Sequence, residues 1–251
     1  MIRSFGISNV GRVRSNNEDA YANRPELNLF VVADGMGGAQ AGERASQLTV
    51  QTVVDQVTQV GQEAGLEALI RGAERANANV RWEASQHPEL AGMGTTLVAV
   101  IVRPPKAYIV NVGDSRAYRQ GRGGLEQVTT DHSWVNEIGK SLGLTDEQLK
   151  VHPYRNVLTK AVGAEDEIQV EGFEIELEPD DVLLLCSDGL HGVTGDGPLV
   201  DIMGSDGSLE YKCEALIDTT LAYGAPDNVT AVLVENTAED DGSASDETAD
   251  V

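Results

Sequence analysis

Short apolar runs rich in Val, Ile, Leu and Ala recur along most of the chain, and turn-forming residues separate them. Runs of roughly 4–8 such residues are typical of β-strands that are buried in a sheet. The runs predict strands at Leu29–Ala33, Thr95–Val102, Ala107–Val112, Arg116–Gln120, Val170–Leu177, Val182–Ser187 and Val229–Val234. The turn clusters 103–106 and 120–124 each follow one of these strands closely, so we predict hairpins and antiparallel pairing.

Two longer segments have the periodicity of helices instead. Apolar residues from Leu66 to Ala84 recur at helical spacing and form one stripe, with charged residues on the opposite face. The segment Ala41–Val60 is also helical in pattern, and a shorter helix, Thr145–Lys150, begins at a threonine cap. Blocks of strands with blocks of helices predict an α+β fold, with sheets inside and helices outside.

The composition is that of a soluble globular protein, and its charge narrows the classes of function. The 251 residues are 41% hydrophobic and 4% aromatic, and they carry a formal net charge of −23. This excess of acidic residues repels nucleic-acid phosphates and favours cations or basic surfaces on partner proteins, so we expect no nucleic-acid partner. Cys186 and Cys213 have neither disulfide nor zinc-site spacing, which indicates reduced thiols.

The two ends of the chain carry further expectations. The N-terminal residues lack the apolar core of a signal peptide, and no run approaches the ~20 apolar residues of a membrane span. The last seventeen residues hold seven acidic residues and no basic one, so we predict a disordered tail. We expect a folded domain at residues 1–235, a tail at residues 236–251, a cytoplasmic location and no membrane association.

Four acidic residues lie at the ends of predicted strands, and two more lie in the N-terminal segment 14–19. They are Glu18, Asp19, Asp34, Asp114, Asp188 and Asp227, and most have Gly or Asn beside them. A single Asp-Gly pair is ordinary turn chemistry. Four or five carboxylates at one sheet edge would repel one another strongly unless cations neutralised them.

The donor set limits which cation fits. Oxygen ligands without histidine or cysteine at useful spacing select hard ions, namely Mg2+, Mn2+ or Ca2+. No stretch has the acid spacing of an EF-hand, so a pair of Mg2+ or Mn2+ ions is the sharper prediction. Such a pair can activate a water for in-line attack on phosphorus. Arg14, just before the acids at 18 and 19, is either the clamp for that phosphate or an ordinary surface arginine.

Eight short motifs follow one another along the chain. They are GRVRSNNEDA (11–20), FVVADGMGG (30–38), GMGTTLV (92–98), VGDSRAY (112–118), TDHS (130–133), RNVLTKAVG (155–163), CSDGL (186–190) and PDNVT (226–230). In this order they resemble bacterial metal-dependent protein phosphatases of the PP2C (PPM) type, over about residues 2–235. The resemblance implies a four-layer α-β-β-α sandwich of two antiparallel sheets, a binuclear Mn2+ or Mg2+ centre, and hydrolysis of phosphoserine and phosphothreonine in proteins.

The resemblance also implies the ligands of the first metal. Asp34 would bridge the two ions, and the carbonyl of Gly35 would bind one of them. Asp188 and Asp227 would complete the first shell. A glycine at position 35 would let the backbone approach the ion closely.

The remaining roles come from the same resemblance. Glu18 and Asp19 would hold the second metal or its waters, and Asp114 would support a third, weaker one. Arg14 would bind the substrate phosphate. Arg14, Asp19 and Asp34 would form the catalytic group, with the metal-bridging hydroxide as nucleophile and no phosphoenzyme.

One position departs from the animal members of that family. Met36 stands where they commonly have a histidine that protonates the leaving oxygen, so the general acid is open. A metal-bound water near Asp114 or Asp19 could donate the proton instead. Of the chain's own histidines, His132 has a structural interpretation, and His191 follows the acid at 188, where it could line the cleft.

Three functions fit this sequence. An active phosphatase is the main hypothesis, because every expected acid is present. A sensor domain that kept the metals but lost turnover is the alternative, and a sporulation-type phosphatase acting on a small regulatory protein is the third. We expect a monomer that acts on phosphorylated proteins, including substrates of a eukaryotic-like serine/threonine kinase.

Overall fold

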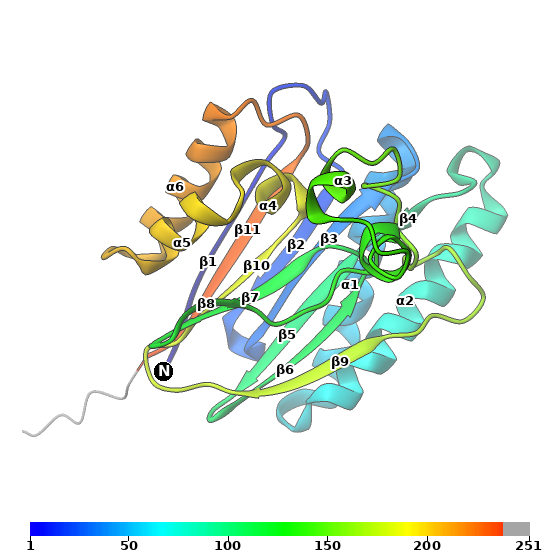
Figure 1. Cartoon of the computed structure of the whole chain (residues 1–251). Coiled ribbons are helices and arrows are strands. Elements are labelled where there is room, and N and C mark those ends of the chain that lie inside the picture. The colour runs from blue at the N-terminus through cyan, green and yellow to red at the C-terminus, as the bar shows by residue number, and fades with distance from the viewer. Residues whose placement is uncertain (238–251) are drawn as a thin grey trace, which may run out of the picture.

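The computed structural model of the chain describes residues 1–237, apart from the side chains of Ala39, Asp146 and Lys150. Two antiparallel sheets are stacked in the middle of the molecule (Figure 1). The first contains, in spatial order, β1 (Ile2–Asn9), β11 (Val229–Asn236), β10 (Val182–Cys186), β7 (Arg116–Gly121) and β8 (Gly124–Gln127). The second contains β2 (Asp19–Arg24), β3 (Leu29–Met36), β5 (Leu97–Arg103), β6 (Lys106–Val112) and β9 (Glu171–Glu176), with β4 (Gly94–Thr95) paired to β3.

Helices cover the outer face of each sheet. The pair α1 (Ala39–Val60) and α2 (Leu66–Gln86) packs on the sheet that contains β3. On the other sheet lie α4 (Asp188–Thr194), α5 (Asp196–Gly204) and α6 (Leu209–Ala222). A short helix, α3 (Asp146–Lys150), lies in the segment between β8 and β9. The predicted α+β sandwich of four layers is therefore confirmed.

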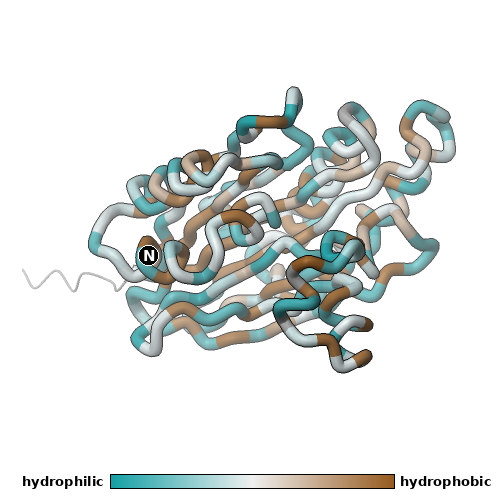
Figure 2. Tube along the Cα trace, turned by 45° about the horizontal axis from the view of Figure 1, so that its top comes forward, coloured by the Kyte–Doolittle hydropathy of each residue, from teal (hydrophilic) through white to brown (hydrophobic). Residues whose placement is uncertain are grey.

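The central strands β3, β5 and β10 are mostly apolar because both of their faces are buried. In β3, Leu29, Val31 and Ala33 pack under α1 and α2, whereas Phe30 and Val32 lie between the sheets. The same alternation runs along β5 and β10. Figure 2 shows apolar positions concentrated along the inner strands and polar ones in the connections. Continuous apolar runs are thus the expected pattern for the middle layers of this architecture.

Most predicted elements are confirmed, with several differences. The hairpins are present, since β5 pairs with β6 and β7 with β8. The run 95–102 is divided at Thr96 into β4 and β5. Strands β1, β2 and β8, and helices α4 and α5, were not predicted, because they are short or half-exposed and have weak periodicity.

The C-terminal strand reaches further than expected. β11 continues to Asn236, the first residue of the predicted tail, because Glu235 and Asn236 pair with β1. The rest of the predicted tail, from residue 238, lies outside the described residues. Within residues 1–237, no helix is long and apolar enough to cross a membrane.

Candidate active site

Strand direction brings the predicted acids to one edge of the sandwich. β3, β6 and β10 end at this edge, and their antiparallel neighbours β2, β7 and β11 begin there. Five of the six acids line one cleft of about 500 Å³, namely Glu18, Asp34, Asp114, Asp188 and Asp227, together with Arg14, Gly35 and Met36. Asp19 pairs with Asp34 across β2 and β3 and lies behind the cleft wall.

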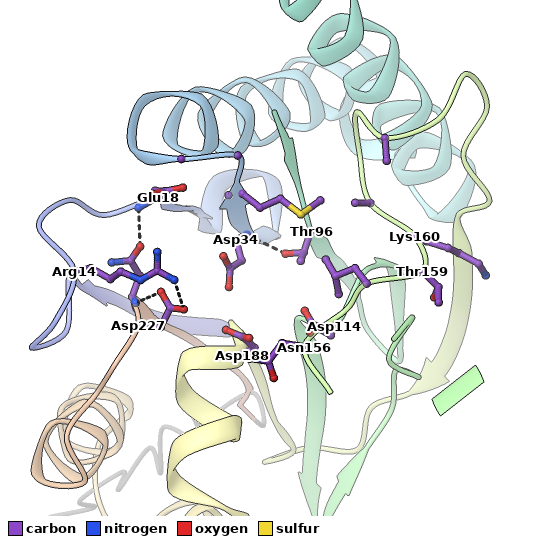
Figure 3. Close-up of a pocket in the computed structure, with 18 residues that line it drawn as sticks. Arg14, Glu18, Asp34, Thr96, Asp114, Asn156, Thr159, Lys160, Asp188 and Asp227 are labelled. Atoms are coloured by element: carbon purple, nitrogen blue, oxygen red, sulfur yellow. Dashed lines mark hydrogen bonds and ion pairs between the residues drawn. The ribbon is translucent and has the colours of Figure 1, made fainter. Parts of the chain in front are cut away.

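Asp34 is fixed by its backbone at the end of β3. Its N–H donates to Thr96 Oγ1 (2.9 Å), and its carbonyl accepts from the Thr95 hydroxyl (2.8 Å) and the Thr96 N–H (2.9 Å). The carboxylate faces Asp188 and Asp114 in the middle of the cleft (Figure 3). Thr96 was not predicted as a site residue, although it lies in one of the quoted motifs.

The glycine after Asp34 has a packing role. A Cβ at Gly35 would lie 2.1 Å from the Gly42 carbonyl oxygen of α1 and 2.6 Å from the Glu18 carbonyl oxygen. No other residue fits this contact without moving backbone. The structure thus gives a reason for Gly35 besides approach to a metal.

The central carboxylates strongly perturb one another's titration. Burial, reinforced by the charges of Asp19, Asp188 and Asp114, raises the pKa of Asp34 well above its usual value. Burial and the charge of Asp227 also raise the pKa of Asp188, which shares a hydrogen bond with Asp34. Burial and Asp188 raise the pKa of Asp114 to about 8. Only a proton or a cation makes this proximity tolerable.

Two hydroxyl groups hold the carboxylate of Asp19 by hydrogen bonds. Its Oδ2 accepts hydrogen bonds from Ser187 (2.8 Å) and Thr230 (2.6 Å). Its Oδ1 is buried and has no partner among the described residues. Burial raises its pKa to about 6, against the effect of the two hydroxyls. Neither Ser187 nor Thr230 was predicted to take part in the site.

Glu18 is buried between α1 and the start of β11. Its N–H donates to Asn228 Oδ1 (2.8 Å), and a Cβ at Gly42 would lie 1.9 Å from its Oε2. Asn228 also donates to the carbonyls of Val10 (3.0 Å) and Asn16 (2.9 Å). One buried amide therefore fixes the whole loop that carries Arg14.

Arg14 and Asp227 form an ion pair at the rim. Arg14 Nη2 lies 2.8 Å from Asp227 Oδ2, and the two side chains are 48% and 35% exposed. The hydrogen bond from this guanidinium group to Asp227 is the main cause of its raised pKa. Gly11, with φ of +78°, brings this loop against Asp227, because a Cβ there would lie 2.2 Å from the Asp227 carbonyl oxygen.

The two histidines near the site support it from outside the cleft. His132 Nδ1 accepts from the Gly113 N–H (3.1 Å), as its structural interpretation predicted. The expectation that His191 could line the cleft was wrong. Helix α4 directs its ring toward the backbone of the β6–β7 turn. There its Nε2 donates to the Asp114 carbonyl (3.0 Å), and burial lowers its pKa to about 4. Met36 does line the cleft, and no histidine lies in its described lining.

The side chains of the cleft are chemically suited to a pair of hard divalent ions, because their donor atoms are carboxylate oxygens. Burial and mutual repulsion raise the pKa values of these carboxylates, so a cation would stabilise their charged form. The Oδ1 atom of Asp19, which has no partner among the described residues, is a further donor. Among the described residues, no three carboxylate, imidazole or thiol groups already form a closed metal cage. The assignment of divalent metal ions to this cleft therefore rests on the oxygen donors and on the negative charge of the clustered carboxylates.

Comparison with known proteins shows a similarity to phosphatases that extends over the whole domain. Residues 11–236 match the family model described as protein phosphatase 2C. The chain is 37% identical over 232 residues to a serine/threonine phosphatase, stp, of Listeria welshimeri, covering 90% of this chain and 92% of that protein.

Solved structures agree with this match. The fold superposes on the serine/threonine phosphatase PstP/Ppp of Mycobacterium tuberculosis with a TM-score of 0.86 at 30% identity, covering 94% and 99% of the two chains. It also superposes on a PstP catalytic domain in complex with two manganese ions, with a TM-score of 0.85, 30% identity and the same coverage.

Metal should stabilise the protein more as the pH rises. The raised pKa values of Asp19 and Asp114, about 6 and about 8, mean that the folded chain binds more protons than the unfolded one. Without metal, these groups make the free energy of unfolding fall from about pH 4 to about pH 8. We expect the Tm difference between Mn2+ and a chelator to grow from pH 5.5 to pH 8, measured by scanning fluorimetry. An equal or smaller difference at pH 8 would contradict this assignment.

Substitution at Gly42 tests its contacts with Glu18 and with the backbone of Gly35, whose carbonyl carbon would lie 2.9 Å from the new Cβ. In Gly42→Ala the new methyl group must displace the Glu18 carboxylate, so we expect Mn2+ affinity to fall by about tenfold in calorimetric titration. Gly197→Ala on α5 is the matched control, because a Cβ there meets nothing within 4 Å. Unchanged Mn2+ affinity in Gly42→Ala would show that Glu18 takes no part in metal binding.

Proposed function

Because this chain belongs to the protein phosphatase 2C family, we propose that it removes phosphate from phosphoserine and phosphothreonine in proteins with the help of two Mn2+ or Mg2+ ions. One observation carries the proposal. Four aspartates from distant parts of the chain, Asp34, Asp114, Asp188 and Asp227, converge in one cleft with Arg14 at its rim. A surplus of carboxylates with one arginine suits a phosphate that is bound through cations.

The residues divide between the metals and the substrate. Asp34, the Gly35 carbonyl, Asp188 and Asp227 would hold the first ion, and Asp34 would be shared with the second. When bound, such a pair supplies an activated water and offsets charge on the phosphoryl oxygens. The two manganese ions bound by the related PstP domain support this assignment.

The two acids at the start of β2 would act on the second ion. Glu18 and Asp19 would hold the second ion or its waters, and the hydroxyls of Ser187 and Thr230 keep the Asp19 carboxylate oriented. Asp114 would serve a third, weaker ion. Neither the choice between Mn2+ and Mg2+ nor the third ion follows from the related structures, so both stay predictions.

Arg14 is placed to bind the phosphate. Its guanidinium carries five N–H donors, and Asp227 engages Nη2. The remaining donors can bind phosphate oxygens at the rim while the loop stays fixed by Asn228. The pair also couples substrate binding to the metal site, since Asp227 serves both.

The sensor interpretation is less well supported. Degenerate relatives of this kind usually lose one of the core acids, whereas all six predicted acids are present at or directly behind the cleft. The sporulation-type hypothesis shares the same chemistry and differs in its target. Substrates of a eukaryotic-like kinase, a monomeric state and a cytoplasmic location remain our predictions.

The decisive experiment uses two substrates and one isosteric variant. With Mn2+, the protein should hydrolyse p-nitrophenyl phosphate and a phosphothreonine peptide, and chelation should abolish both activities. Asp34→Asn should lose at least about 10²-fold in kcat, because it removes the charge shared by both ions. Glu210→Gln, an exposed change on α6, is the control that should keep full activity. A protein that is silent with Mn2+ yet binds a phosphoprotein tightly would favour the sensor.

Asp114 is the candidate that supports protonation of the leaving oxygen in place of the missing imidazole. In the chain without metal, burial and the charge of Asp188 raise its pKa to about 8, so Asp114 binds a proton readily there. Asp114→Asn should slow an alkyl phosphate by about 10²-fold, while p-nitrophenyl phosphate, whose leaving group needs no proton, should change much less. Equal sensitivity to the leaving group in both proteins would remove Asp114 from this role.

A further inference from the structure

A second cavity of about 350 Å³ adjoins the catalytic cleft. Thr159, Lys160 and Ala161 line both cavities, so this segment is their common wall. The far side of the second cavity is formed by Glu165, Glu167 and their neighbours. A chain bound with its phosphate among the central carboxylates can therefore place a nearby side chain in the second cavity.

The wall and the acidic loop are held firmly. The buried amide of Asn77 accepts from the Gly163 N–H (2.7 Å) and donates to the carbonyls of Glu165 (3.0 Å) and Asp166 (3.3 Å). Val162 forms a two-way backbone bridge with Thr95, beside the strand that carries the acid at position 34. The loop thus has a fixed position relative to the catalytic carboxylates.

The charge of the second cavity is not compensated. Glu165 and Glu167 are exposed and form no ion pair with any residue in the described range 1–237, whereas Asp166 between them is paired with Arg81. Lys160 points away from the central carboxylates (Figure 3), and its Nζ lies 3.8 Å from Glu137 Oε1. The second cavity is therefore lined by two carboxylates without an ion pair among the described residues and by one lysine whose ammonium group already has a partner.

The common wall also contains an unused polar atom. Thr159 Oγ1 is shielded from water and has no hydrogen-bond partner among the described residues. Buried hydroxyl groups are normally paired, so this oxygen is an unused hydrogen-bonding atom in the wall between the two cavities. A backbone amide of a bound peptide could supply the missing bond after a small rotation of the hydroxyl.

We propose that the second cavity is a substrate subsite that takes a basic side chain, Lys or Arg, close in sequence to the phosphorylated residue. The inference rests on the proposed phosphatase function. Glu165 and Glu167 bind the cationic end of that side chain, and its methylene stem lies along Ile168. Because one residue of an extended peptide spans about 3.3 Å, the basic residue lies within roughly three positions of the phosphothreonine.

Matched phosphothreonine peptides test the subsite. Peptides that differ only in having Arg, Gln or Glu at each of the three positions on either side are compared by kcat/KM. We expect Arg to be preferred over Glu by roughly fivefold at one or two positions, a modest factor because the carboxylates are exposed. In Glu165→Gln/Glu167→Gln the preference should disappear, and in Glu165→Lys/Glu167→Lys it should reverse.

The controls separate failure of the subsite from failure of the phosphatase. Glu210→Gln/Glu214→Gln on α6 makes the same change in charge on the opposite face and should keep the Arg preference. Hydrolysis of p-nitrophenyl phosphate, which cannot reach the second cavity, should be the same in all these variants. Equal kcat/KM for the Arg and Glu peptides in the active wild type would overturn the subsite alone. Silence toward every substrate would overturn the proposed function and the subsite with it.

Discussion

Repulsion between carboxylates at one edge of the sandwich is the constraint on which the site depends. Asp34 lies near the end of β3 and Asp188 directly after β10, and the apolar residues of both strands form the core, so neither acid can move away without disturbing that core. The fold therefore stores an unfavourable electrostatic arrangement, which protons relieve at low pH and divalent ions relieve at neutral pH. The hydrophobic layers on both sides of each sheet stabilise the structure enough to tolerate it. Functional sites commonly contain such clusters of groups with shifted pKa values, which lower the stability of the fold locally but serve the reaction.

The surroundings of these carboxylates keep their positions without neutralising them. Two histidines whose pKa values are lowered by burial, His132 and His191, bond the backbone of the β6–β7 turn at Gly113 and Asp114. Arg116, whose charge could quench the centre, is instead occupied by Asp131 through two hydrogen bonds of 2.8 and 2.6 Å. The cation that borders the aspartates directly is Arg14, at the rim. The arrangement keeps negative potential inside for metal ions and positive charge at the entrance for phosphate.

The sequence predicted those parts of the fold and the site that leave a local pattern in the chain. Apolar runs buried on both faces revealed the central strands, and an acid directly after such a run, as at Asp34, revealed the site. Half-exposed strands such as β1 lacked that signal, since their alternation is incomplete. Ser187, Asn228 and Thr230 could not be assigned roles, because their hydrogen bonds join residues more than 40 positions apart. The placement of His191 was wrong for a similar reason, since the rotation of a helix about its axis is set by packing rather than by the distance to the acid at 188.

The position of β11 has a consequence for biosynthesis. This strand is the last among the described residues 1–237, yet it lies between β1 and β10, and its first residues adjoin Asp227 and Asn228. A ribosome releases β1 long before its hydrogen-bonding partner exists, so that strand must wait with an open edge. Both the sheet and the catalytic machinery are completed in the same late event. A nascent chain that is still being translated is therefore enzymatically silent, and a messenger truncated before this strand yields a product without activity.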